Sequence, residues 1–167
     1  MLLLVGARPG EVLALRWADV DEKWRSITIR DKVEGERAIP LTTYVHKLIR
    51  GIPKSTHFRD GRLRQIEWVF SSPLSKTGQV AKPHQLLAQA CKEAEIDGLT
   101  LHGLRRSFAS LSEWLEIPAG VVAQIMGHKP SATAEKHYKV RPLDLLRVHH
   151  ERIEIWILEQ AKMKLDA

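Results

Sequence analysis

Hydrophobic residues recur at helical spacing along most of this chain. The longest such segment covers residues 142–165, in which Leu146, Ile153 and Ile157 would share one face of a helix. Shorter segments of the same kind predict helices over residues 9–16, 43–50, 83–94, 101–115 and 118–126. Two runs rich in β-branched and aromatic residues, 24–29 and 37–41, flank a Glu34-Gly35-Glu36 turn. The pattern therefore predicts an α+β fold that is mostly α-helical, with a small antiparallel β-sheet near the N-terminus.

Individual residues mark where several predicted elements begin and end. Thr42 is placed to cap the helix over 43–50, and Gly127 is placed to end the helix over 118–126. Pro53 and its polar neighbours predict a loop over 52–60, and residues 68–70 predict a short buried strand. Residues 131–138 predict a further short helix. The sequence has no internal repeat, so we treat residues 1–167 as one domain.

Composition narrows the classes of partner and the cellular compartment. The formal net charge is +6 and the pI is near 9.6, which favours a polyanionic partner but only weakly. A single cysteine, Cys91, excludes an intramolecular disulfide, fits a reducing cytoplasm and is expected to fill apolar space. The apolar run at residues 1–5 is far shorter than the ~20 residues that span a bilayer. We therefore expect a cytoplasmic protein with no membrane partner.

Six residues with complementary chemistry lie in separate local motifs: Arg8, Lys32, His102, Arg105, His128 and Tyr138. Cleaving a phosphodiester without a metal requires cations on the phosphate, an aligned nucleophile and a proton for the leaving oxygen. Arginine pairs with phosphate oxygens through a planar fork and stays charged. Tyrosine can form a covalent phosphotyrosine, and lysine or histidine can transfer the proton. The set therefore favours metal-free phosphoryl transfer on a nucleic acid.

The motifs around these residues closely resemble those of the tyrosine recombinases, the phage integrase family, over almost the whole chain. The resemblance implies the catalytic-domain fold of that family and site-specific recombination of double-stranded DNA through a 3′-phosphotyrosyl intermediate. It also implies a bacterial or phage origin, other integrase protomers as partners in a tetrameric synapse, and no metal or nucleotide cofactor. The matching motifs are Gly6-Ala7-Arg8-Pro9-Gly10-Glu11, His102-Gly103-Leu104-Arg105-Arg106-Ser107-Phe108-Ala109 and Met126-Gly127-His128-Lys129-Pro130.

The resemblance assigns a role to most members of the set. Arg8 and Arg105 would hold the phosphate, Tyr138 would attack it, and His128 would donate to the scissile phosphate. His102 lies three residues before Arg105, which places both on one face of a helix. Tyr138 follows His128 by ten residues, whereas many family members have nine, so the local register differs by one.

Two further residues are assigned with open alternatives. Glu11 would orient the arginines, or it would simply complement the helix dipole from the first turn, and the two roles are compatible. Lys32 aligns with the family's hairpin lysine, the general acid for the leaving oxygen. Its competitors nearby are the three cations Lys23, Arg30 and Arg37. The run from Lys32 to the Arg37-Ala38-Ile39-Pro40-Leu41 segment favours Lys32.

Other functions and arrangements remain open at this point. A type IB topoisomerase-like enzyme would share the chemistry, and a prophage remnant would bind DNA without cleaving it. A metal site built from His102, His128 and His137 is disfavoured by the arginines nearby. Residues 1–5 resemble the end of a core helix, so we expect the family's N-terminal DNA-clamping domain to be absent. The helix over 142–165 would pack on its own domain or on a neighbouring protomer.

Overall fold

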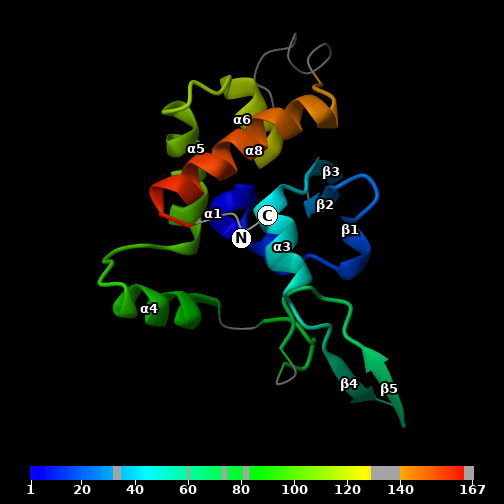
Figure 1. Cartoon of the computed structure of the whole chain (residues 1–167). Helices are drawn as coiled ribbons and strands as arrows, with labels where there is room; N and C mark the ends of the chain where they lie inside the picture. The colour runs from blue at the N-terminus through cyan, green and yellow to red at the C-terminus, as the bar shows by residue number, and fades with distance from the viewer. Residues whose placement is uncertain (32–34, 60, 73–74, 81–82, 129–139, 164–167) are drawn as a thin grey trace.

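The computed structural model describes residues 1–31, 35–59, 61–72, 75–80, 83–128 and 140–163 (Figure 1). Its helices are α1 (Leu2–Val5), α2 (Pro9–Leu13), α3 (Thr43–Arg50), α4 (Pro83–Glu93), α5 (Leu101–Glu113), α6 (Ala119–Met126) and α8 (Leu143–Gln160), with a 3-10 turn η1 (Trp17–Asp19). Its strands are β1 (Val20–Asp21), β2 (Ser26–Asp31), β3 (Gly35–Pro40), β4 (Thr56–Arg59) and β5 (Arg62–Gln65). The predicted helices over 43–50, 83–94, 101–115 and 118–126 are confirmed to within two residues.

The predicted sheet near the N-terminus has three antiparallel strands in the order β1-β2-β3. Strands β2 and β3 pair from Ser26 with Pro40 to Asp31 with Gly35. Their side chains Ile27, Ile29 and Ile39 are buried in the core. The strand begins two residues later than predicted. Arg25 has a φ of 50°, which breaks the extended backbone before Ser26, so Trp24 lies exposed in the preceding turn.

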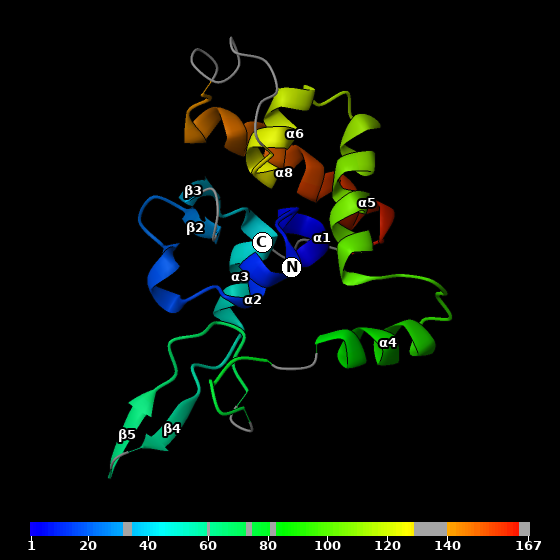
Figure 2. The same ribbon diagram turned by 180° about the vertical axis from the view of Figure 1, so that it is seen from behind.

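The last helix packs on its own domain. α8 contacts β3, α6, α5 and α1, and it crosses the body of the molecule in both views (Figures 1 and 2). Its residues Leu146, Ile153 and Ile157 are buried there, as the periodicity predicted. The helix is shorter than predicted, because it ends at Gln160 and Lys162 adopts a left-handed φ of 53°.

A buried histidine on α8 helps to hold the N-terminal helix. The His150 Nε2 donates to the carbonyl oxygen of Leu4 at 2.8 Å, and the ring meets Phe108 edge-on at 5.7 Å between centroids. Burial lowers the pKa of His150 to about 4, so the imidazole is neutral at neutral pH. α8 therefore fixes the segment that leads into the Arg8 motif.

A second contact from α8 replaces the helix cap that the sequence predicted. Thr42 occupies the N-cap position of α3, but its hydroxyl makes no capping bond and donates instead to the buried carboxylate of Glu154. That carboxylate also accepts the backbone amides of Tyr44 at 2.7 Å and Val45 at 3.1 Å. A side chain distant in sequence thus satisfies the first turn of α3.

Replacing Glu154 by alanine is expected to destabilise the fold by about 3–5 kcal/mol, because it leaves two amides and a hydroxyl buried without an acceptor. Urea unfolding followed by circular dichroism measures this loss. Glu159 is exposed on the same helix, and its replacement by alanine is expected to change stability by less than about 0.5 kcal/mol. Equal unfolding midpoints for the two variants would contradict the assigned capping role.

The predicted loop over 52–60 is wrong, because β4 and β5 form an antiparallel hairpin there. Asp60-Gly61 is a strong turn signal that Pro53 and the polar composition obscured. The hairpin projects away from the body (Figures 1 and 2), and Phe58 and its cross-strand partner Leu63 are 75% and 69% exposed. No hydrophobic alternation is needed where neither face of a hairpin is buried.

The strand predicted at 68–70 is reduced to a single bridge. Trp68 pairs with Arg16 in isolation, while Val69 is fully buried and donates its amide to the carbonyl of Leu15 at 2.9 Å. The prediction that residues 68–70 are buried holds for Val69, but the segment around Arg16 pairs with them at one bridge and forms no ladder.

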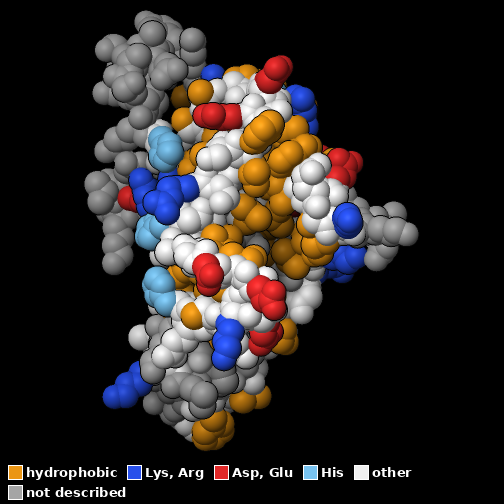
Figure 3. Space-filling model, turned by 90° about the vertical axis from the view of Figure 1, so that its left-hand side faces the viewer, with side chains coloured by type: hydrophobic (Ala, Val, Ile, Leu, Met, Phe, Trp, Pro, Cys, Tyr) orange, Lys and Arg blue, Asp and Glu red, His pale blue; other side chains and the backbone are white. Residues whose placement is uncertain are grey.

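Helix α4 lies apart from the main core. None of its residues is buried, and Cys91, which was expected to fill apolar space, is partly covered. The face that carries α4 and α5 shows a hollowed band of hydrophobic side chains across its middle (Figure 3). None of the helices in the described part of the chain is long and apolar enough to cross a membrane.

Candidate functional site

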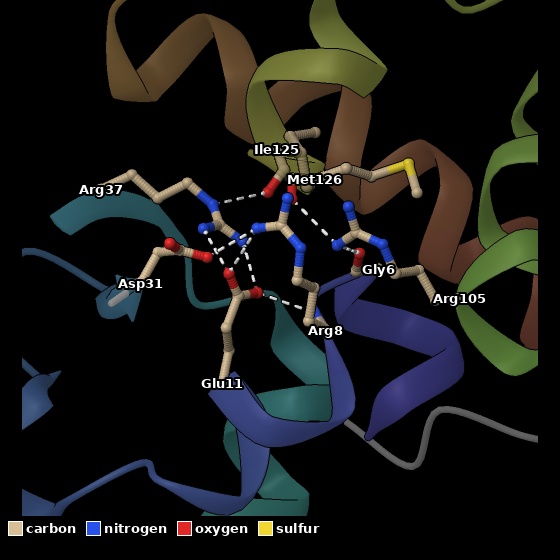
Figure 4. Close-up of polar contacts among 8 residues, drawn as sticks. All are labelled: Gly6, Arg8, Glu11, Asp31, Arg37, Arg105, Ile125 and Met126. Atoms are coloured by element: carbon tan, nitrogen blue, oxygen red, sulfur yellow. Dashed lines mark hydrogen bonds and ion pairs between the residues drawn. The ribbon is translucent and has the colours of Figure 1, made fainter. Parts of the chain in front are cut away.

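Arg8 is held at the junction between the first two helices. α1 ends at Gly6, whose φ of 64° reverses the chain, and Arg8 then takes the extended N-cap position of α2. Its amide donates to Glu11 Oε2 at 2.7 Å. Its Nη1 donates to Glu11 Oε1 at 3.1 Å and to Asp31 Oδ2 at 2.7 Å (Figure 4). The side chain is still 37% exposed, so the guanidinium is oriented while remaining accessible.

Glu11 contacts a second arginine through the same two carboxylate oxygens that accept from Arg8. Arg37 extends from β3, and its Nη1 and Nη2 donate to the two carboxylate oxygens of Glu11 at 3.1 and 2.9 Å. Figure 4 shows the Glu11 carboxylate between the Arg8 and Arg37 side chains. Glu11 thus lies in the first turn of α2 and contacts both arginines, an arrangement compatible with each of the two roles expected from the sequence.

The ionisation of Glu11 follows from these contacts. Burial raises the pKa of this carboxyl, but hydrogen bonds from the Arg37 guanidinium and the Arg8 amide outweigh burial. The resulting pKa is below the ordinary value for glutamate. Glu11 is consequently a carboxylate at neutral pH and can balance the two cations.

Arg105 lies on α5 and points into the domain. Its Nη1 donates to the carbonyl oxygens of Gly6 at 2.6 Å and Met126 at 2.9 Å (Figure 4). These carbonyls lie at the C-terminal ends of α1 and α6, where a cation also complements the helix dipole. Phe108, one turn later, leaves no room for a side chain at Gly6, because a Cβ there would lie 2.5 Å from the phenyl ring. α5 thus ties the Arg8 motif to the end of α6.

His128 lies directly after Gly127, the residue that ends α6. Gly127 has a φ of 75° and closes α6, as predicted, while the His128 amide donates to the carbonyl of Ala123 at 2.8 Å. The His128 side chain is exposed. Arg37 also contacts this corner, because its Nε donates to the carbonyl of Ile125 at 3.2 Å.

The remaining predicted residues are placed differently. His102 lies in the first turn of α5 with an exposed side chain, whereas Arg105 on the same helix is buried. The α5 turn is capped by Thr100, whose hydroxyl accepts the Gly103 amide at 2.8 Å. Lys32 and Tyr138 lie outside the described residues, as does the helix predicted over 131–138.

Two of the three competitors of Lys32, Arg30 and Lys23, are engaged elsewhere in the structure. Arg30 pairs with the buried Asp19 and with Glu36, the latter at 3.6 Å. The Lys23 Nζ lies over the Trp24 ring, 5.6 Å from its centroid, which is a cation–π distance. Within the described ranges, no group of three or more His, Cys, Asp or Glu side chains could hold a metal ion.

Residues 1–142 match the family model described as the phage integrase family. The chain belongs to this family. It is 54% identical over 161 residues to prophage integrase IntF of Escherichia coli (strain K12), covering 96% of this chain and 34% of that relative. The chain therefore spans about a third of the length of this curated relative.

Solved structures of other recombinases share the fold of this phage integrase domain. The integrase from mycobacterium phage Brujita has a TM-score of 0.68 at 19% identity, covering 91% of this chain and 48% of that one. XerA recombinase has a TM-score of 0.58 at 18% identity, with coverages of 98% and 56%. The Tn1549 transposon integrase (aa 82-397) in complex with circular intermediate DNA has a TM-score of 0.58 at 20% identity, with coverages of 90% and 55%. The predicted tyrosine recombinase catalytic-domain fold is confirmed.

Sequence reasoning about this integrase domain missed two members of the site. Asp31 was not considered, and Arg37 was considered only as a rival to Lys32. The Arg37-Ala38-Ile39-Pro40-Leu41 segment was a usable signal, because its resemblance to the family singled out Arg37. In the structure β3 pairs in register with β2, and Arg37 lies next to the Arg8 motif. The contact itself joins residues 26 apart and could not be derived from spacing alone.

Proposed function

We propose that this chain is the catalytic part of a site-specific DNA recombinase of the integrase type, acting on double-stranded DNA. The observation that carries the proposal is the arrangement around Gly6. Arg105 binds the Gly6 carbonyl and the end of α6, so the segments bearing Arg8 and His128 meet at one corner of the domain. This corner can present two arginines to one phosphate.

The bonds and protons of the proposed reaction are accounted for without a metal or nucleotide cofactor. Tyr138 forms a bond from its phenolic oxygen to phosphorus, and the bond from phosphorus to the 5′-oxygen breaks. Lys32, with His102 and His128, would manage the proton that leaves the tyrosine and the proton that the 5′-oxygen gains. Arg8 and Arg105 would stabilise the charge on the phosphorane, and a 5′-hydroxyl of the partner strand would reverse the step.

The same proposal covers partners and location. Strand exchange needs two DNA sites, so we propose that further integrase protomers join this chain in a synapse on DNA, and that it acts in the bacterial cytoplasm. The exposed Arg8 side chain, together with the net charge of +6, supports a polyanionic substrate.

A nicked duplex that loses its short 5′-hydroxyl fragment after cleavage tests the proposal, because the covalent intermediate then accumulates. We expect labelled DNA from a pool of candidate attachment sites to become covalently bound to the chain in the presence of EDTA. The adduct should survive denaturation in detergent. DNA binding that yields no adduct would instead favour a role limited to binding DNA.

A further inference from the structure

We propose that Arg37 is a positioning residue of the DNA-cleavage site, acting on Arg8 through Glu11 and on His128 through the end of α6. The proposal rests on the recombinase function proposed above. Arg37 itself is not assigned a contact with DNA. Its side chain is 18% exposed, and three of its donors are already directed at Glu11 and Ile125.

The first argument concerns charge. Arg8 contacts two carboxylates, Glu11 and Asp31, and one cation between two anions is poorly suited to attract a phosphate. Arg37 binds both oxygens of Glu11 and so adds a compensating positive charge. Arg37 therefore offsets the negative charge that Glu11 places beside Arg8.

The second argument concerns direction. The two parallel bonds from Arg37 fix the plane of the Glu11 carboxylate, and the same carboxylate accepts the amide and Nη1 of Arg8 (Figure 4). A lysine could supply the charge but not the fork. Loss of Arg37 would leave the Glu11 carboxylate held only by Arg8 among the bonds described here, so Glu11 would orient the Arg8 side chain less firmly.

The third argument concerns the end of α6. The Arg37 Nε holds the Ile125 carbonyl, and a Cβ on Gly127 would lie 2.5 Å from the Arg37 Cζ. The guanidinium therefore packs directly against the residue that precedes His128. One side chain on β3 thus contacts both segments that carry proposed catalytic residues.

Cleavage rates on the nicked duplex test this role. We expect Arg37→Met to slow adduct formation about 10- to 100-fold, less than the loss of a donor that contacts the phosphate itself. Arg37→Lys should recover part of the rate, because charge returns without the fork. Arg152→Met, which removes an exposed arginine from α8, is the matched control and should keep the parent rate.

A double variant separates positioning from general support of the fold. If Arg37 acts through Glu11, Glu11→Gln combined with Arg37→Met should cleave within about 3-fold of Glu11→Gln alone. Multiplied losses would overturn the action of Arg37 through Glu11, and an Arg37→Met variant that cleaves at the parent rate would overturn the whole proposal. Unfolding midpoints show whether each variant is folded, and Arg37→Lys replaces Arg37→Met if the latter is not.

An NMR measurement keeps the inference testable apart from the proposed function. In Arg37→Lys we expect the amide resonances of Arg8 and His128 to shift, while that of Ile153 stays in place. Unchanged Arg8 and His128 resonances would overturn the positioning role even if the parent chain cleaves DNA. A parent chain that forms no adduct, with both resonances shifted as expected, would count against the recombinase function and leave the positioning of Arg8 and His128 supported.

Discussion

Replacing Tyr138 by phenylalanine is expected to abolish the covalent protein–DNA adduct, a loss of at least about 10⁴-fold. The change removes one oxygen, and without it no bond to phosphorus can form. Arg8 and Arg105 remain, so DNA binding should be retained. Electrophoresis of labelled nicked duplex in detergent measures the adduct, and peptide mapping of the parent adduct locates the modified residue.

Tyr44→Phe is the matched control, because the sequence contains only two tyrosines. Tyr44 lies in α3, and its backbone amide rather than its hydroxyl bonds to Glu154. We therefore expect an adduct yield equal to the parent. An adduct that persists in Tyr138→Phe, or one mapped to the neighbouring His137, would show that the nucleophile has been wrongly assigned.

Arg105→Ala is expected to lower both cleavage and stability. Removing a donor to the transition-state phosphate typically costs about 10²- to 10³-fold in rate. In addition, the carbonyls of Gly6 and Met126 lose a charged donor in a buried site, which should destabilise the fold by about 2–4 kcal/mol. Adduct formation at saturating DNA and urea unfolding measure the two effects separately.

The neighbouring Arg106 provides the comparison for stability. Its side chain is exposed on the same helix, so Arg106→Ala should change the free energy of unfolding by less than about 0.5 kcal/mol. Arg105→Lys is informative for cleavage, because it keeps the charge but loses the planar fork. A fully active and stable Arg105→Ala would remove Arg105 from both proposed roles.

Local signals predicted much of the fold because they depend on near neighbours. The extent of α3 follows from the helical pattern over residues 43–50, and the end of α6 follows from Gly127. The motifs around Arg8 and Arg105 likewise identified the family before any geometry was known. In each case the signal lies in the residue concerned and its neighbours in the sequence.

The features that sequence reasoning missed are set by tertiary contacts. Glu154 caps α3 from 112 residues beyond Thr42, and Arg37 reaches Glu11 only because β3 returns alongside β2. The hairpin of β4 and β5 was missed for a different reason. It places His57 opposite Arg64 and buries no face, so it lacks the hydrophobic alternation by which strands are usually predicted.

The anchoring of α8 has a consequence for how the chain folds during synthesis. Leu4 is held by His150, and the start of α3 is held by Glu154, so both contacts join segments more than 100 residues apart in the sequence. A nascent chain leaving the ribosome cannot make either contact until α8 has emerged. Pairings of such long sequence separation also slow folding, because the loop must close before it is stabilised. The segment that carries Arg8 is made well before α8, and it should be among the last to become ordered.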